Sequence, residues 1–226
     1  MAEELVPAKE LLDRSIAYHD PQGIWMKSSH RLLLSETRPN GTVRKTTIVI
    51  DNREGSFRMT RSVADGPDTE IYVKGDTVEA KLMGSTEFSS EEAEENRLTP
   101  EAAIRTRNYY LYLYGLPMKL LDPGTRLDPK TRRASFLGKD VLELKVTYDE
   151  DVGKDTWYFY FEPKTTSLVG YRFYHDEEKN DGECITLEEE IRSGEIRLPR
   201  IRKWYTNDEN KHLGTDKIES VEELQQ

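Results

Sequence analysis

The sequence has little cysteine: Cys184 is the only one among its 226 residues. A single thiol cannot form a disulfide within the chain, and it excludes a metal site built from several cysteines. Cys184 lies in a strand-like run, so we interpret it as a buried structural thiol rather than a nucleophile. A lone cysteine does not decide the cellular compartment.

Long hydrophobic runs are also missing. No stretch approaches the ~20 apolar residues that a membrane-spanning helix needs, so no transmembrane segment is predicted. Residues 1–10 are acidic and lack the apolar core of a signal peptide. Two interpretations follow: the protein is cytoplasmic, or the chain is a mature segment whose export signal has been removed.

Positive charge is in deficit. The chain has 33 lysines and arginines against 43 aspartates and glutamates, a formal net charge of -10. Nucleic-acid binding needs a basic face, and attraction to anionic membranes needs a basic surface, so the charge balance argues against both. Short basic clusters at residues 132–133 and 197–203 are interpreted as solvated strand edges.

The familiar motifs of catalysis and cofactor binding are absent. The sequence has no Gly-x-Ser-x-Gly elbow, no phosphate-binding Gly-x-x-x-x-Gly-Lys-Ser/Thr loop and no Gly-x-Gly-x-x-Gly. The acidic runs 91–95 and 188–190 could hold calcium, but the sequence has no EF-hand calcium loop, and the acidic loops 149–151 and 176–181 are interpreted as solvated. We therefore predict neither a reaction nor a cofactor.

Residues 155–176 contain the clearest structural signal. Trp157, Phe159 and Phe161 alternate with more polar neighbours, which is the period of two that a strand requires. Pro163 ends this strand, and residues 168–175 resume the alternation in a second strand. Aromatic residues occur on both faces, so we expect one face to meet a core and the other something apolar, such as a helix or a ligand.

The periodicities predict an α+β chain that is mainly β with helices. The expected segments are a helix at 5–18, strands within 24–83, helices within 89–115, strands within 132–218 and a frayed tail at 219–226. About eleven strands are joined mostly by short turns, such as the one at Asp65-Gly66-Pro67. The predicted architecture is a single domain over residues 1–226: one curved antiparallel sheet, an unclosed half-barrel wrapped on two or three helices.

The helices in the middle of the chain have well-marked starts. Ser89 and Glu92 fit a capping box, and Thr99 fits a cap that places a proline at the first helical position. The second helix is expected to end at Gly115. Its second half is apolar nearly all round, so we expect it to lie inside the curved sheet.

Several segments are similar to a family of uncharacterised bacterial envelope proteins that carries only a domain-of-unknown-function label. These segments are residues 15–21, 107–110, 114–119, 154–159 and 174–177. The order of elements, with the Glu-Pro-Lys-Thr hairpin, resembles the LolA/LolB-type lipoprotein-carrier fold. That resemblance implies an unclosed β-barrel around helices and an apolar cavity, in a protein that is periplasmic or associated with the outer membrane. Precursors in that family usually carry an export signal.

Aromatic and apolar side chains are the candidates for ligand contacts. We predict that they line a cavity for a lipid, an acyl chain or another apolar ligand, and the alternative is an ordinary core. The predicted ligand-binding residues are Trp25, Tyr110, Tyr114, Leu116, Met118, Trp157, Phe159 and Phe161. On this hypothesis the protein is a monomeric, non-enzymatic binding protein of the cell envelope, with another envelope protein as a further partner.

Two His-Asp pairs suggest a different function, that of a metal-dependent enzyme or a metal-binding protein. His19-Asp20 follows the first helix and His175-Asp176 follows a central strand, so the pairs could converge on a metal ion if their loops meet. The simpler interpretation is that each aspartate is a turn or capping residue. A third hypothesis is a protein-interaction module with a filled core that uses a sheet edge or an apolar patch.

Overall fold

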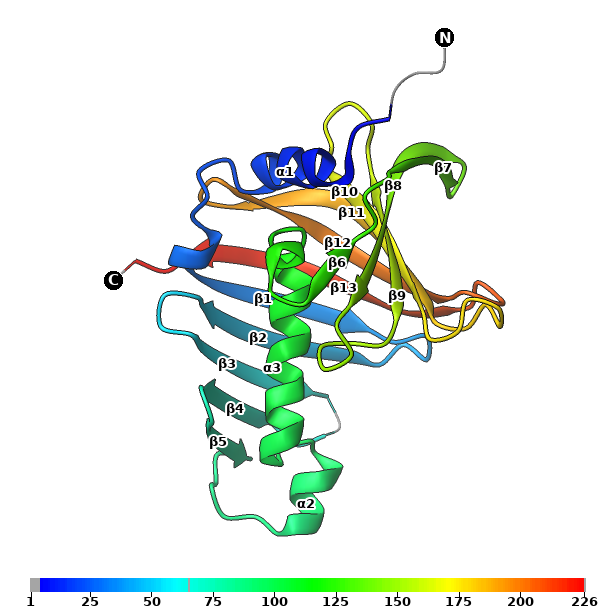
Figure 1. Ribbon diagram of the computed structural model, residues 1–226. Coiled ribbons are helices and arrows are strands. Elements are labelled where there is room, and N and C mark those ends of the chain that lie inside the picture. Colours follow the sequence, from blue (N-terminus) through cyan, green and yellow to red (C-terminus); the bar gives the residue numbers. More distant parts are fainter. Residues whose placement is uncertain (1–4, 65, 226) are drawn as a thin grey trace. The chain divides into compact units, whose positions relative to one another are not determined.

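The computed structural model describes residues 5–64 and 66–225, and its fold is α+β. Within these residues, thirteen antiparallel strands form one sheet in the order β5-β4-β3-β2-β1-β13-β12-β11-β10-β9-β8-β6, with β7 paired to β8 (Figure 1). The order begins at β5 and ends at β6, so the sheet is not closed into a barrel, as the sequence predicted. Contacts divide the chain into two compact units: residues 5–22, 117–190 and 199–215, and residues 23–116, 191–198 and 216–225.

The first unit contains one α-helix and most of the second half of the sheet. Its helices are α1 (Ala8–His19) and the short 3-10 turn η2 (Met118–Leu121). Its strands are β6 (Thr125–Leu127), β7 (Arg132–Phe136), β8 (Lys139–Tyr148), β9 (Thr156–Phe161) and β10 (Leu168–Tyr174). It also holds most of β11 (Glu183–Ser193) and β12 (Ile196–Thr206), and the start of β13 (His212–Glu223).

Helix α1 begins three residues later than the predicted start at residue 5. Pro7 has an extended backbone and forms a bridge with Lys130, so the chain becomes helical only at Ala8. The helix buries Leu11, Leu12 and Ser15, and Figure 1 shows it lying beside β10 and β11. Its apolar stripe is thus what attaches it to the first unit.

The predicted aromatic hairpin is β9 and β10. Phe159 faces Tyr171 across the pair, and both are fully buried on one face. On the other face the ring of Tyr160 stacks on Phe136, the last residue of β7, with centroids 4.2 Å apart. The apolar material expected on the second face is therefore a side chain of the protein itself.

Gly170 of β10 makes room for this contact. A Cβ at this position would lie 2.4 Å from the Phe136 ring and 2.8 Å from the carbonyl oxygen of Ile185. A ring edge and a backbone carbonyl cannot both move aside without shifting the strands.

We predict that Gly170→Ala lowers the free energy of unfolding by about 1–3 kcal/mol, the cost of overpacking. Urea denaturation would measure it. The control is Gly153→Ala in the same unit, where the nearest side-chain atoms would be 3.7 Å from the new Cβ, an ordinary contact. Equal unfolding midpoints for the two variants would contradict the account.

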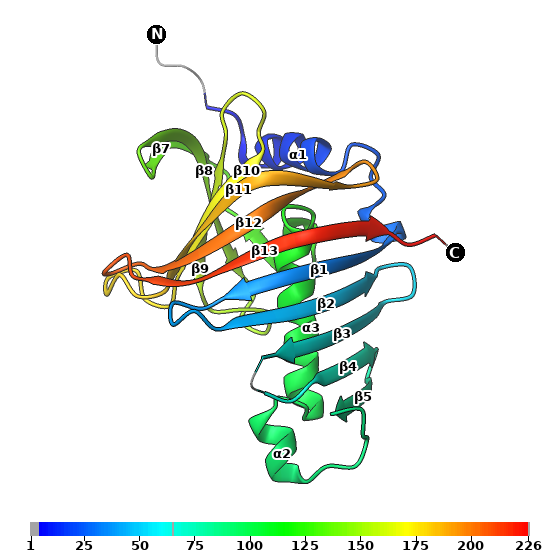
Figure 2. The same ribbon diagram turned by 180° about the vertical axis from the view of Figure 1, so that it is seen from behind.

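The second unit is a meander of five strands covered by a helix. Its elements are η1 (Trp25–Lys27), β1 (Ser29–Thr37), β2 (Val43–Asp51), β3 (Ser56–Val63), β4 (Thr69–Lys74), β5 (Thr77–Leu82), α2 (Ser90–Glu95) and α3 (Pro100–Gly115). Each strand pairs with the next. Helix α3 crosses one face of these strands, as the opposite views in Figures 1 and 2 show.

The capping predictions for the middle helices are confirmed. The Ser89 side chain accepts a hydrogen bond from Glu92 N, and the Glu92 carboxylate accepts one from Ser89 N, which completes the capping box of α2. Thr99 caps α3, and Pro100 is its first residue. Gly115 is its last, as predicted.

Other boundaries differ from the predictions. The expected strand at residue 24 begins only at Ser29, because residues 25–27 form the η1 turn. The described residues form thirteen strands rather than about eleven, since β6 was missed and β7 and β8 are separate strands. Residues 219–223 are not frayed: they continue β13, where Glu222 pairs with Arg31.

Two predicted features touch residues outside the described chain. Asp65 of the predicted 65–67 turn and Gln226 of the predicted tail lie outside it.

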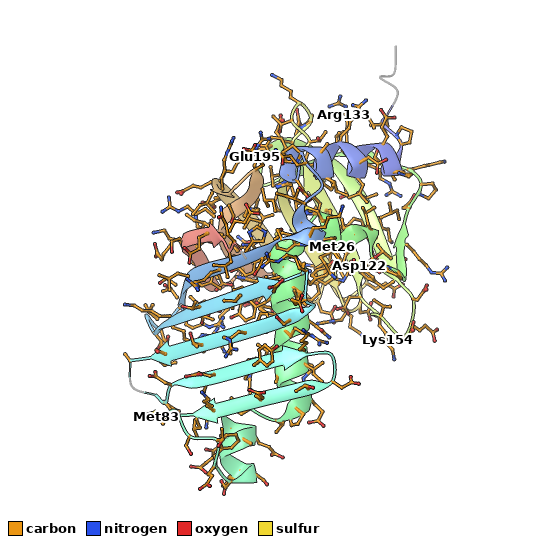
Figure 3. The ribbon with its side chains drawn as sticks, turned by 90° about the vertical axis from the view of Figure 1, so that its left-hand side faces the viewer. Met26, Met83, Asp122, Arg133, Lys154 and Glu195 are labelled. Carbon is orange, nitrogen blue, oxygen red and sulfur yellow. The ribbon has the colours of Figure 1, made fainter. Side chains whose placement is uncertain are left out.

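Figure 3 shows Met83, which is 69% exposed, just after β5. Among the described helices, none has the length and apolar character that crossing a membrane requires.

Candidate functional site

The predicted ligand-binding residues fall into the two units. Met118, Trp157, Phe159 and Phe161 belong to the first. Met118, Phe159 and Phe161 are buried, while Trp157 is partly buried and stacks on Phe173 of β10, with centroids 4.8 Å apart. Within this unit Met118, Phe159 and Phe161 belong to the buried core.

Trp25, Tyr110, Tyr114 and Leu116 belong to the second unit, and all four are buried. The Trp25 ring stacks on His30, with centroids 5.3 Å apart. Of these four, Tyr110 is the residue that reaches a pocket.

The pocket lies wholly within the second unit and has a volume of about 900 Å³. We call it the arginine pocket. Its lining residues are Glu36, Arg38, Arg44, Arg61, Glu94, Arg97, Thr99, Glu101, Ala102, Arg105, Thr106, Tyr109 and Tyr110. Five arginines face three glutamates, so the pocket is positive in a chain whose net charge is -10. The lining is more polar than the apolar cavity that the resemblance implied.

One face of α3 forms a wall of the pocket. Ala102, Thr106, Tyr109 and Tyr110 follow the i, i+4, i+7, i+8 spacing of a single helical stripe. Thr99 begins the helix by accepting a hydrogen bond from Ala102 N at 3.3 Å. The wall therefore offers two aromatic rings, Tyr109 and Tyr110, whose centroids are 5.2 Å apart.

Strand register assembles the floor. Glu36 of β1 pairs with Arg44 of β2, and Thr46 of β2 pairs with Arg61 of β3. Each lies on the same face as the buried apolar residues of its strand, because side chains two apart share a face. These polar side chains thus lie at the end of the otherwise apolar sheet face that is turned toward Tyr110.

Glu36 is the centre of this floor, with its side chain 3% exposed. Its Oε1 accepts hydrogen bonds from the Tyr110 hydroxyl at 2.9 Å and from Arg44 Nη2 at 3.2 Å. Its Oε2 accepts one from the Thr46 hydroxyl at 2.5 Å and lies 3.6 Å from Arg61 Nη2. A buried carboxylate needs such compensation.

Arg61 closes the network through the same two hydroxyl groups. Its Nε donates to Thr46 Oγ1 at 3.1 Å, and its Nη2 donates to the Tyr110 hydroxyl at 2.6 Å. Burial raises the pKa of Tyr110, and the neighbouring Glu36 carboxylate raises it further. The phenol therefore stays protonated and donates a hydrogen bond to Glu36. This network fixes Tyr110 in the pocket wall.

We predict that Glu36→Ala lowers the free energy of unfolding by about 3 kcal/mol, because Arg44 and Arg61 lose their buried counter-ion. Chemical denaturation would measure the loss. The matched control is Glu222→Ala, which removes the pair with Arg31, whose two side chains are 56% and 50% exposed. We expect its effect to stay within about 0.5 kcal/mol. A similar loss in both variants would contradict the role of the network.

The two His-Asp pairs have separate local partners. The Nε2 of buried His19 accepts a hydrogen bond from Leu168 N at 3.0 Å, so its lone pair is already used. Asp20 is buried after α1, and Asp176 pairs with Lys179 at 2.7 Å. His175 Nδ1 lies 2.7 Å from Asp155 Oδ1. Within residues 5–64 and 66–225 no group of three or more His, Cys, Asp or Glu side chains could hold a metal ion.

The His175–Asp155 contact has a measurable consequence. The hydrogen bond to Asp155 raises the pKa of His175 above its usual range. We predict that Asp155→Asn lowers this pKa, as NMR titration of the imidazole would show. Asp151→Asn removes an equal charge from the same loop region without that hydrogen bond, so its effect should be much smaller. Equal shifts would mean that general charge, not the contact, controls the imidazole.

The raised pKa of His175 makes folding stability depend on pH. The stabilisation from the protonated imidazole is fully present below the unfolded-state pKa of about 6.5 and is lost as pH rises through the folded-state pKa. Because the imidazole is mostly exposed, we expect a small effect on stability.

Comparisons with known proteins agree with this fold. Residues 1–223 match the family described as a family of unknown function, DUF6503. The chain belongs to this family. No match was found among curated proteins.

Similar solved structures were also found. A LolA superfamily protein from Nitrosomonas europaea is 12% identical, with a TM-score of 0.58, and the match covers 98% of this chain and 94% of that one. A domain described as an outer membrane lipoprotein-sorting protein, from Vibrio parahaemolyticus, is 11% identical over 95% and 92% of the two chains, with a TM-score of 0.47. A DUF1329 family protein from Desulfovibrio piger is 12% identical over 96% and 92%, with a TM-score of 0.47. At such identities the likeness to the first is one of fold, and this DUF6503 member has a LolA-like fold.

Sequence reasoning missed the arginines of the pocket. They are spread from residue 38 to residue 105, so no cluster marks them in the sequence. A signal was nevertheless present in the strands. Glu36 follows Leu32 and Leu34 at inward positions, and Arg61 follows Phe57 and Met59. Charged residues at the inward positions of two apolar faces indicate a buried ionic group.

Proposed function

We propose that this protein is a non-enzymatic binding protein of the bacterial cell envelope whose ligand is lipid-like. The observation that carries the proposal is the arginine pocket of about 900 Å³ against α3. Ligand sites typically fall in the range of ~300–1,000 Å³. The polar end of a ligand would meet the arginines, and its apolar part would pack on Tyr109 and Tyr110.

The helical wall supports a preformed site. Tyr110 is fixed by hydrogen bonds to Glu36 and Arg61, so a ligand would not have to order it. Tyr109 is 44% exposed, which leaves ring surface for contact with an apolar group. Association would gain roughly 25 cal/mol per Å² of apolar surface buried, before ordering costs.

The fold supports the cellular setting of the proposal. The LolA-like fold and the resemblance to envelope proteins favour the periplasm or the outer-membrane surface as the location. A second envelope protein that delivers or receives the ligand is the expected macromolecular partner. Fold likeness alone does not carry function, so the pocket must be tested directly.

Native mass spectrometry of protein purified from a bacterial host provides the first test. We expect an additional mass of a few hundred daltons that is lost on denaturation. A bare mass before and after incubation with host lipid extract would contradict the proposal.

Filling the pocket should abolish this binding. We predict that Thr106→Trp, on the pocket wall of α3, lowers lipid retention at least tenfold while the thermal transition is kept. Asn108→Trp is the matched control, because Asn108 is an exposed α3 residue outside the pocket lining. Retention that is unchanged in Thr106→Trp would place the ligand elsewhere.

A further inference from the structure

Three arginines of the pocket have no ion pair in the part of the chain that the structure describes. They are Arg38 after β1, Arg97 between α2 and α3, and Arg105 on α3. Arg44 and Arg61 differ, since both pair with Glu36 in the floor. The pocket therefore holds guanidinium groups whose charge the protein leaves available.

Arg97 also has an unusual backbone. Leu98 N donates to Ala93 O at 2.7 Å and Arg97 N donates to Glu94 O at 3.2 Å, which is the Schellman pattern that ends a helix. In this pattern the first residue after the helix cap has a left-handed backbone, and that residue is Arg97, with φ of 57°. Glycine is the usual residue there because it has no Cβ. Arg97 thus occupies a strained backbone position in the lining of the pocket.

The charge balance sets the ligand class. Glu94 and Glu101 line the pocket and offset part of the arginine charge, and Glu36 offsets part of the charge of the floor. Five arginines against three glutamates leave two positive charges, which match a phosphate monoester of about -1.5 to -2 at neutral pH. Arginine rather than lysine supplies every cation, and the planar guanidinium pairs with phosphate oxygens in a bidentate fashion. The N-terminus of α3, at Thr99, adds the positive end of a helix dipole.

We infer that the arginine pocket binds a phosphate monoester group through Arg38, Arg97 and Arg105. This inference rests on the proposed function, because the phosphate would be the head of the lipid-like ligand. The same chemistry could also come from a free phosphate, so the experiment separates the two sources.

Calorimetric titration with three soluble probes tests the inference. The probes are inorganic phosphate, dihexanoyl phosphatidic acid and dihexanoylglycerol, which is the same lipid without its phosphate. Phosphatidic acid binding at least tenfold more tightly than both others would support a lipid phosphate. Inorganic phosphate binding as tightly as phosphatidic acid would support the phosphate site and count against the lipid.

Two outcomes overturn the inference. If dihexanoylglycerol binds as tightly as phosphatidic acid, the head-group inference fails while lipid binding stands. If neither phosphate probe binds, the phosphate site is excluded whatever dihexanoylglycerol does. The failure of the inference is therefore distinguishable from the failure of the proposed function.

Variants separate a role in binding from a role in folding. Arg97→Gly relieves the left-handed strain, so it should unfold at a temperature equal to or above that of the unaltered protein. We expect it nonetheless to bind dihexanoyl phosphatidic acid about tenfold more weakly, the factor that one charge-assisted hydrogen bond is worth. Arg105→Gln should weaken binding similarly.

The matched control is Arg58→Gln. Arg58 lies on the opposite face of β3 from Arg61 and stacks over Tyr72, 4.9 Å from the ring centroid. Its substitution should leave phosphatidic acid binding unchanged. Equal weakening in Arg58→Gln and Arg97→Gly would reduce the effect to overall charge and overturn the site.

Discussion

The second unit depends on one buried carboxylate, that of Glu36, and on the partners that satisfy it. Glu36 is held by two arginines and two hydroxyl groups, which satisfy both of its oxygens inside the sheet face. The arrangement requires three strands in one register and α3 at a position where Tyr110 can donate. A buried charge left without partners is very unfavourable, so the network specifies where α3 lies on these strands.

The same constraint creates the pocket. Arg44 and Arg61 neutralise Glu36 in the floor of the pocket. The other arginines of the lining are then available to a ligand. An apolar floor would have made the pocket an apolar cavity rather than a charged one. The pocket thus combines a polar base with the aromatic stripe of α3, and this combination suits an amphiphile better than a purely apolar molecule.

The two units cover the apolar faces of their strands with different elements. In the first unit the aromatic hairpin buries one face, and the β7–β8 hairpin places Phe136 on the other. Its predicted ligand residues are therefore mostly committed to packing. In the second unit α3 packs on β4 and β5, and it lines the arginine pocket with residues within the stretch from Glu101 to Tyr110. Tyr109 and Tyr110 of α3 line this pocket together with the arginines.

Local sequence signals determined most of the fold. Alternation predicted the strands, caps predicted α2 and α3, and the aromatic hairpin was located correctly, because these patterns depend on neighbours within a few residues. The short strand β6 and the late start of α1 were missed, since each depends on pairing with a distant segment.

The site was decided by tertiary structure. The aromatic residues and the family resemblance suggested a binding role, and of the eight predicted residues Tyr110 is the one that lines the pocket. Arg38, Arg97 and Arg105 come from two loops and a helix, so nothing in their spacing could predict that they converge. The sequence by itself determined which residues are apolar and which strands form. Only the folded chain decided which charges meet, because Coulomb interactions depend on distance in space and not on separation along the chain.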